Sequence, residues 1–325
     1  MEYPLEYILC VEGGYLERQA KLLIHSIRSL EGPHGLAPIT AYQPRAHYKV
    51  SQETRQFFEA HQVTFIDLPL NREHRHYYFA NKPIICAYHE ARTQAQNVVY
   101  LDCDLLVYQP PTTFGTLTPG QIFCRPEDAH GYGTTVDFDD ENGEIWQRAY
   151  QALDITHTTP VRTIRDYALV QPYYNAGHFA FHKADGFCVQ WLGHFERMVR
   201  EHWLPKRCFI LSEQMAFSLT VTQMQLEVVP METLYNFPAN LWAFDPIDHP
   251  AYQNHSLDEV CTMHYHKIFL RGYNPLASEL ARTERGQQLN EKIEEFGLLK
   301  KAPVSLVTKI RRRYDDWQAH RKYSY

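Results

Sequence analysis

The 325-residue sequence lacks several features that would assign it to common protein classes. Its seven cysteines are scattered, odd in number and never form a C-x-x-C pair, which argues against a disulfide framework or a zinc knuckle. The apolar runs are all shorter than the roughly 20 residues of a membrane-spanning helix. The opening MEYPLEYILCVEGG has neither a basic region nor a long apolar region, so we expect no secretory signal. We therefore expect reduced thiols in a soluble, cytoplasmic protein.

An excess of positive charge is also absent. The chain has 32 Lys and Arg against 38 Asp and Glu, which gives a formal charge of −6. Domains that bind nucleic acids usually concentrate basic residues on one face and have a high isoelectric point. We therefore expect no nucleic-acid partner and favour small molecules or glycans. Hydrophobic residues (44%) and aromatic residues (14%) are abundant, so the chain can bury a large core.

Strand-like and helix-like segments alternate over the first hundred residues. Strands are predicted over residues 7–11, 39–42, 63–68 and 97–101, and helices over 20–30, 51–61 and 83–94. This alternation predicts an α/β fold with an open, mostly parallel sheet, helices on both faces and ligands at the carboxyl ends of the strands.

The regular alternation of strand-like and helix-like segments ends after residue 110. Prolines and glycines there indicate loops, including residues 125–172, and the acidic residues 137–141 indicate a solvated surface. Further strands are predicted over 178–181, 226–229 and 260–266, and further helices over 186–202 and 213–222. Acceptor specificity is expected to lie in the loops.

The sharpest chemical feature follows the apolar run 97–101. Asp102 and Asp104 are two positions apart, and in an extended segment such side chains point to one face. The pair can bind Mg²⁺ or Mn²⁺ directly or through water. Phosphatases that form an aspartyl phosphate also place D-x-D after a strand. They usually place it after the first strand and follow it with a Gly-Thr pair, whereas residues 105–107 here are Leu-Leu-Val, so we disfavour that alternative.

Two other segments contain candidate ligands. In a strand, His264 and His266 would share a face, and an imidazole can complete a Mn²⁺ site that two carboxylates begin. The chain has 18 histidines, so such pairs also arise by accident, and we interpret residues 74–76 (His-Arg-His) as surface. Near Asn175 and Gly177, a small-residue turn lets a ligand approach the backbone, while an ordinary β-turn explains it equally well.

Together these motifs resemble the family 8 glycosyltransferases of the GT-A fold, the glycogenin and lipopolysaccharide galactosyltransferase type. The resemblance spans about residues 5–275 and rests on V-V-Y-L-D-C-D-L-L-V, Y-Y-N-A-G-H-F-A-F, L-S-E-Q-M-A-F-S, Y-N-F-P-A-N-L-W and M-H-Y-H-K. It implies a GT-A catalytic domain over residues 1–276 and a helical, basic tail over 277–325. It also implies a hexosyltransferase that moves a sugar from a UDP-sugar to an unknown glycan, lipid-linked or protein acceptor, with retention.

The resemblance further implies a metal and donor site. The implied ligands of Mn²⁺, or of Mg²⁺, are Asp102, Asp104 and His264. The implied donor-binding residues are Glu12 and Tyr15 for the uracil, Lys82 for the diphosphate or sugar, and Asn175 and Gly177 for the sugar. Each of these has an ordinary structural reading as well, such as a loop residue or a solvated lysine near a helix start.

Catalytic roles follow from the same resemblance. Gln214 matches the residue beneath the anomeric carbon, Asp104 serves as metal ligand, and Lys267 or Arg271 stands in for a lysine near the leaving diphosphate. The sequence departs from the family at Met215, where an acidic residue is usual, and at the ending H-x-x-G-x-x-K-P-W. These departures slightly favour a competing interpretation, a catalytically degenerate protein that binds carbohydrate or nucleotide. The intact Asp102, Asp104, His264 and Asn175 count against it.

Another alternative is a nucleotidyltransferase on a similar sheet. Such enzymes usually have an early Gly-rich loop with Arg and Lys, and residues 12–15 (Glu-Gly-Gly-Tyr) lack both basic residues. The pattern therefore favours the transferase.

The tail suggests a further partner. Residues 300–325 contain eight Lys and Arg against two Asp, with Ile310, Tyr314 and Trp317 interleaved. Such a segment can lie on an anionic membrane, at the inner face, where a lipid-linked acceptor would be found. We prefer an amphipathic helix that packs on the domain with a solvated basic face. The sequence also leaves a homo-oligomer open.

Overall fold

The computed structural model describes residues 5–203, 211–244, 247–301 and 305–323. The chain divides into two compact units, each assembled from separate stretches of sequence. Unit 1 comprises Met1–Pro69, Val99–Thr116 and Met231–Val304, and unit 2 comprises Leu70–Val98, Leu117–Pro230 and Ser305–Tyr325. The domain boundary at residue 276 stays a prediction.

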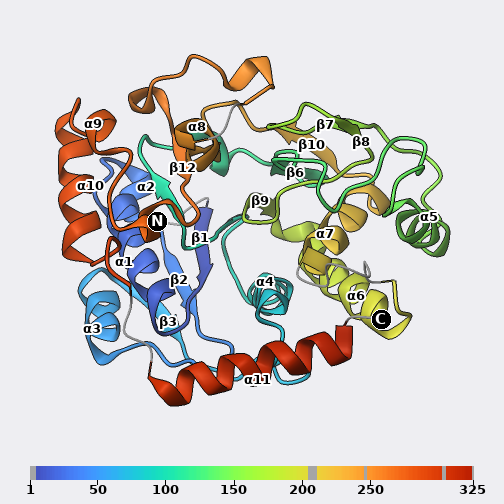
Figure 1. Cartoon of the computed structure of the whole chain (residues 1–325), viewed down its shortest axis with the longest axis horizontal. Helices are drawn as coiled ribbons and strands as arrows, with labels where there is room; N and C mark the ends of the chain where they lie inside the picture. The colour runs from blue at the N-terminus through green and yellow to red at the C-terminus, as the bar shows by residue number, and fades with distance from the viewer. Residues whose placement is uncertain (1–4, 204–210, 245–246, 302–304, 324–325) are drawn as a thin grey trace. The chain divides into compact units, whose positions relative to one another are not determined.

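A mostly parallel sheet is the central feature of the fold (Figure 1). Within the described residues its strand order is β10-β6-β9-β4-β1-β2-β3. The β1–β2, β2–β3 and β6–β10 ladders are parallel, and β6 pairs with β9 in the antiparallel sense. Strand β4 (Asn97–Leu101) is buried at all five positions, as its uninterrupted apolar run predicts. The predicted α/β fold with an open, mostly parallel sheet is confirmed.

Unit 1 contains the first two βα repeats and the third strand. Its strands and helices are β1 (Leu5–Cys10), α1 (Tyr15–Arg28), α2 (Pro33–Leu36), β2 (Ile39–Tyr42), α3 (Gln52–Ala60), β3 (Val63–Ile66), β5 (Leu105–Val107), β11 (Phe237–Pro238), α8 (Ala239–Phe244), β12 (Thr262–His264), α9 (Ala277–Leu280) and α10 (Glu284–Glu295). A Cβ atom on Gly13 would lie 2.2 Å from the carbonyl oxygen of Lys49, so the turn between β1 and α1 requires glycine. Apolar residues at helical spacing bury one face of α1, as predicted.

Arg285 ties α10 to the rest of unit 1. Its guanidinium donates hydrogen bonds to the carbonyl oxygens of Ser26, Ser29, Val107 and Tyr108 at 2.6 to 3.0 Å. These carbonyls lie at the end of α1 and just after β5, so one side chain satisfies several backbone acceptors at once. These hydrogen bonds hold α1, β5 and α10 together, and α1 and β5 position the candidate site residues of unit 1.

Unit 2 has an aromatic core between its helices and strands. Its elements are α4 (Asn81–Glu90), β6 (Gln121–Cys124), α5 (Gly143–Ala152), β7 (Val161–Arg162), β8 (Leu169–Val170), β9 (His178–His182), α6 (Phe187–Arg200), α7 (Ser212–Gln223), β10 (Glu227–Pro230) and α11 (Leu306–Tyr323). Helix α6 packs against both α4 and α7. The ring centroids of Phe179, Trp191 and Phe217 lie within 5.6 Å of one another. The Trp191 indole N–H donates a hydrogen bond to the carbonyl oxygen of Glu213 at 2.7 Å. The burial of these large rings positions α7.

The prediction that loops follow residue 110 is wrong in part, because the segment contains β6, α5 and the β7–β8 hairpin. Trp146 of α5 is fully buried, so this helix has a packed face. The acidic stretch is also not simply solvated: half-buried Asp140 accepts hydrogen bonds from His130, Thr134 and Thr135 at 2.7 to 3.0 Å. The Pro and Gly content hid these elements, since they are short and depend on tertiary contacts.

The cysteines of the described residues are all free: Cys10, Cys86, Cys103, Cys124, Cys188 and Cys261. Cys208 lies outside the described residues. Burial raises the pKa of the thiols of Cys103 and Cys124, so both are neutral near pH 7 and behave as core residues.

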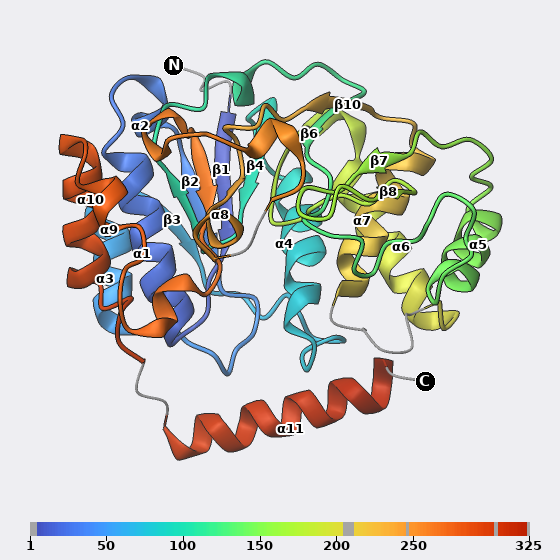
Figure 2. The same ribbon diagram turned by 45° about the horizontal axis from the view of Figure 1, so that its top comes forward.

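Helix α11 is the long red helix of Figures 1 and 2. Asp315, Ala319 and Tyr323 are buried at four-residue spacing, so one side of its second half packs on unit 2. Among the described residues, no helix combines the length and the apolar character needed to cross a membrane.

Candidate functional site

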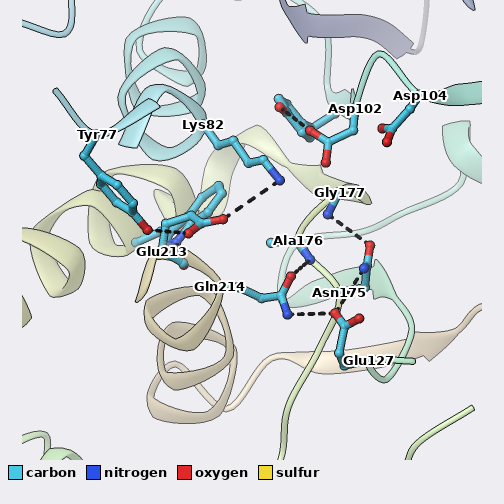
Figure 3. Close-up of polar contacts among 12 residues, drawn as sticks. Tyr77, Lys82, Asp102, Asp104, Glu127, Asn175, Ala176, Gly177, Glu213 and Gln214 are labelled. Carbon is cyan, nitrogen blue, oxygen red and sulfur yellow. Dashed lines mark hydrogen bonds and ion pairs between the residues drawn. The ribbon is translucent and has the colours of Figure 1, made fainter. Parts of the chain in front are cut away.

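Asp102 and Asp104 lie where β4 ends and β5 begins, in unit 1 (Figure 3). Both flanking strands are fully buried, so the connection between them has little freedom. The Tyr100 hydroxyl donates to Asp102 Oδ1 at 2.9 Å. The carbonyl oxygen of Asp104 accepts from the Tyr265 amide at 3.0 Å, which joins this turn to the segment after β12.

His264 reaches Asp104 because β12 pairs with β5 in the antiparallel sense, with His264 opposite Leu105. His264 Nε2 lies 3.1 Å from Asp104 Oδ1, and His264 Nδ1 lies 3.1 Å from Asn236 Oδ1. An amide oxygen at Nδ1 favours the tautomer that leaves Nε2 as an acceptor or a metal ligand. The structure thus brings together two of the predicted metal ligands and adds Asn236 as a side chain that orients one of them.

His266 joins this group by a route that differs from the prediction. Strand β12 ends at His264, and His266 has a left-handed backbone with φ of 47°, so the two histidines do not share a strand face. Their rings nevertheless stack with centroids 3.9 Å apart, and His266 Nδ1 lies 3.7 Å from Asp104 Oδ2. One ligand atom from each of the three residues lies within 4.8 Å of the others.

This group suits a divalent transition metal ion. Two imidazole nitrogens and a carboxylate oxygen are donors that Mn²⁺ accepts. Burial raises the pKa of Asp104, but the facing His264 and His266 lower it to a net value well below the usual range. Asp104 is therefore anionic near neutral pH. Asp102 follows the same strand but is outside the three-residue group.

Glu12 and Tyr15, the predicted uracil contacts, both have protein partners. The Glu12 carboxylate accepts two hydrogen bonds from Arg45, at 2.5 and 2.6 Å, and both side chains are almost fully buried. The Tyr15 hydroxyl donates to the carbonyl oxygen of Leu298 at 2.9 Å. Burial raises the pKa of Tyr15 to about 12, so the hydroxyl stays protonated. Arg45 was not predicted, because a basic residue 33 positions away gives no local signal.

Unit 2 contains the predicted sugar and diphosphate contacts Lys82, Asn175 and Gly177, together with Gln214. Lys82, in the first turn of α4, lies 3.9 Å from Glu213 Oε1, and Glu213 is completely buried at the start of α7 (Figure 3). The Tyr77 hydroxyl donates to the other carboxylate oxygen at 2.9 Å. Lys82 therefore forms a nearly buried ion pair, with its side chain 11% exposed, and the alternative of a solvated lysine is wrong. Its predicted contact with the diphosphate or sugar stays a prediction.

Gln214 and Asn175 are joined by a residue that sequence reasoning missed. Glu127 Oε2 accepts from Gln214 Nε2 at 2.7 Å and from Asn175 Nδ2 at 3.0 Å. Gln214 Nε2 also donates to the Tyr173 hydroxyl oxygen at 2.8 Å. Asn175 Oδ1 accepts from the Gly177 amide at 3.0 Å (Figure 3). A carboxylate that accepts both amides fixes their orientation. Glu127 lies in a loop, where no periodicity marks it.

Lys267 and Arg271 are exposed at the ends of the short turn Ile268–Arg271. The Arg271 guanidinium lies over the Phe244 ring, 3.8 Å from its centroid. A role for either residue at the diphosphate stays a prediction. Met215, the departure from the family pattern, is 1% exposed and therefore serves the core of α7.

Among the described residues, side chains of the candidate site therefore gather in one cluster in each unit. Asp104, His264 and His266 form the cluster in unit 1. Glu127, Asn175 and Gln214 form the cluster in unit 2.

The first cluster follows the buried strand β4. In the second cluster, Gln214 lies at the start of α7 and Asn175 shortly before β9.

Residues 7–225 match the family model of the Rhodobacterales glycosyltransferase domain, more than half of the chain. The chain belongs to this glycosyltransferase family. The membership confirms the predicted relationship to glycosyltransferases. The match to the Rhodobacterales glycosyltransferase domain includes every predicted site residue except His264 and Lys267. No curated protein matches this sequence.

Several solved glycosyltransferases are similar to this chain, and the first of them below has a TM-score above 0.5. The glycosyltransferase GlyE of Streptococcus pneumoniae is 15% identical, with a TM-score of 0.51 over 89% of this chain and 63% of that one. The galactosyltransferase LgtC in complex with donor and acceptor sugar analogues is 13% identical, with a TM-score of 0.48 over 94% and 99%. The bifunctional glycosyltransferase WbbM is 11% identical, with a TM-score of 0.48 over 90% and 52%. The predicted GT-A fold class is confirmed.

Proposed function

We propose that this glycosyltransferase moves a hexose from a UDP-sugar to an acceptor hydroxyl, depends on Mn²⁺ or Mg²⁺, and retains the anomeric configuration. The observation that carries the proposal is the Asp104 carboxylate facing two imidazoles, at 3.1 and 3.7 Å, directly after a buried strand. Two imidazoles beside a carboxylate form a donor set for a divalent ion, and family membership supplies the reaction class.

Residues of unit 1 would hold the ion and the nucleotide. Asp102, Asp104 and His264 are the proposed ligands, and Asn236 orients the His264 ring. When bound, a divalent cation neutralises the charge that develops on the departing diphosphate. Glu12 and Tyr15 are proposed to contact the uracil. In that role the buried Arg45 keeps the Glu12 carboxylate in a fixed position.

Residues of unit 2 would position the sugar. Gln214 is proposed to face the reacting carbon, with Asn175 and Gly177 at the sugar hydroxyls. Glu127 accepts from both amides, so it acts as a positioning residue that presents Gln214 and Asn175 in one arrangement. Such prior orientation lowers the entropy that is lost in reaching the transition state. Lys82 and Lys267 are proposed to add positive charge near the diphosphate.

Substitution of the metal ligands tests the proposal. Asp104→Asn should abolish UDP release and sugar transfer while leaving the circular dichroism spectrum unchanged, because Asp104 is only half-buried. Asp102→Asn should do the same. Asp137→Asn, at an exposed acid in unit 2, is the matched control and should keep full turnover. Undiminished turnover of the Asp104 variant would refute the metal role.

Two alternatives predict different results. A nucleotidyltransferase would form a nucleotide sugar from a sugar phosphate and a nucleoside triphosphate, releasing pyrophosphate, and family membership argues against it. A degenerate binding protein would bind UDP or sugar and release no UDP. Met215, buried in α7, offers no acidic contact to a sugar, which favours this second alternative. Measurement of UDP and pyrophosphate in the same reaction separates all three.

The tail extends the proposal to the acceptor, because α11 has an unusual exposed face. Leu306, Ile310, Tyr314 and Trp317 are exposed and recur at three- or four-residue spacing, so they form one stripe. The buried residues Asp315, Ala319 and Tyr323 lie on the opposite side of the helix. This differs from the preferred expectation that the apolar residues would pack on the domain.

Basic residues border this stripe, namely Lys309, Arg311, Arg313 and Arg321. An apolar stripe bordered by cations suits the surface of an anionic membrane, and the proposed acceptor is therefore lipid-linked. Wild-type protein should float with vesicles containing phosphatidylglycerol, and Ile310→Glu/Trp317→Glu should not. Leu36→Glu, at an equally exposed apolar residue outside α11, is the control. Equal flotation of all three proteins would refute the contact.

A further inference from the structure

A second cluster of metal-ligating side chains lies in unit 2, apart from the proposed donor site. It consists of Glu73, His74 and Glu196, and one ligand atom from each lies within 4.8 Å of the others. Glu73 and His74 precede α4, and Glu196 lies on α6. Both glutamates are exposed, whereas His74 is 6% exposed. None of the three has a part in the proposed transfer.

His74 has a ring nitrogen available for a ligand. Its Nδ1 is hydrogen-bonded to the Tyr323 hydroxyl at 2.5 Å. Its Nε2 is buried and has no hydrogen-bond partner among the described residues. A buried polar atom without a hydrogen-bond partner destabilises the folded state by about 1 to 3 kcal/mol. A ligand at His74 Nε2 would remove this penalty. An imidazole nitrogen without a hydrogen-bond partner can donate its lone pair to a metal ion.

The two glutamates supply the opposite charge. One carboxylate oxygen of Glu73 and one of Glu196 lie within 4.8 Å of each other, so two negative charges face each other. A divalent cation between the carboxylates would relieve their repulsion.

We propose that Glu73, His74 and Glu196 form a second metal site, which takes a divalent transition metal ion such as Zn²⁺. Zn²⁺ binds imidazole nitrogen and carboxylate oxygen at about 2.0 to 2.2 Å, so its ligand atoms lie about 3.4 Å apart in tetrahedral geometry. The present separations of up to 4.8 Å need a contraction of about 1 Å, which the exposed glutamate side chains can provide. Three protein ligands leave the fourth position to water.

Metal binding at this site would hold the C-terminal end of α11 in place. The Tyr323 hydroxyl contacts His74, and Lys322 Nζ donates to the carbonyl oxygen of Glu73 at 3.1 Å. A partner at the second ring nitrogen is the usual support of a ligating histidine. Metal binding would therefore join the segment before α4, helix α6 and the C-terminal turn of α11.

The test uses the full chain with the substitution Asp104→Asn, which removes a proposed ligand of the donor-site metal. Metal binding that remains in this variant reports on the second site alone, so its absence can be distinguished from a failure of the proposed function. Titration calorimetry with Zn²⁺ alone should show a binding event that Glu196→Gln or Glu73→Gln weakens at least tenfold. Both positions are exposed, so these variants should fold normally. Glu144→Gln, at an exposed glutamate of α5, is the matched control and should bind like its parent.

Thermal unfolding provides the second measurement. Zn²⁺ should raise the melting temperature of the Asp104→Asn protein, because an ion that binds only the folded state stabilises it. Glu196→Gln should abolish this rise, and Glu144→Gln should keep it. An absent rise in the parent, or an equal rise in all three proteins, would overturn the proposed site.

Discussion

The ion pair between Lys82 and Glu213 allows a quantitative test of the packing of unit 2. Glu213 is completely buried, and Lys82→Met would leave its carboxylate without this cation. At 3.9 Å and an effective dielectric constant of about 20, the attraction is about 4 kcal/mol. Breaking a buried pair by removing one partner typically costs about 3 to 5 kcal/mol. The Tyr77 hydroxyl still donates to Glu213, so we expect a loss of about 3 kcal/mol.

Urea unfolding of a double-mutant cycle measures this loss. Lys82→Met/Glu213→Gln removes both charges and should lie within about 1 kcal/mol of wild type. Lys21→Met is the control: its pair with Glu53 is shorter, at 2.6 Å, but Glu53 is 78% exposed, so the expected loss is below about 1 kcal/mol. Equal losses for Lys82→Met and Lys21→Met would refute the reasoning that burial, rather than distance, decides the effect.

Three further predictions concern unit 2. Glu127→Gln should lower kcat about tenfold or more, measured as UDP release, because a charged acceptor of the Gln214 amide is lost; an unchanged kcat would exclude the positioning role. Burial raises the pKa of Asp140, but its hydrogen bonds lower it to a net value below normal. The stabilisation that ionised Asp140 gives the folded protein is therefore fully present above its unfolded-state pKa near 4. It is lost as the pH falls through its lower folded-state pKa. Wild type should thus exceed Asp140→Asn in unfolding free energy at pH 7 and lose that advantage in acid, whereas a constant difference would contradict this. Trp146→Ala should cost about 3 to 5 kcal/mol in urea unfolding, because the side chain is fully buried and its indole donates to the Tyr132 carbonyl; a loss below 1 kcal/mol would show that α5 does not pack as described.

The parts of the fold that the sequence predicts best are those with a local signal. Strand β4 has the predicted bounds, because the four residues that follow Asn97 are apolar and suit a strand buried on both faces. Helix α4 begins at Asn81, two residues before the predicted start, since Pro83 fits the first turn of a helix, where amide groups have no helical partner. The D-x-D pair was identified for the same reason, because it directly follows the strand.

The parts that sequence reasoning missed depend on distant residues. His74 was interpreted as surface, and it is buried against Tyr323, 249 positions away. Glu127 meets Gln214 across 87 positions, and neither residue has a periodic neighbour that would indicate the contact. His266 reaches Asp104 through a left-handed backbone that a strand prediction excludes. Only tertiary structure could reveal these contacts.

UDP release from a panel of UDP-sugars, with Mn²⁺ or with EDTA, tests the central claim most directly, because it needs no knowledge of the acceptor. We predict release from one donor in Mn²⁺ and none in EDTA. Absence of release from every donor, together with UDP binding that does not depend on metal, would contradict it.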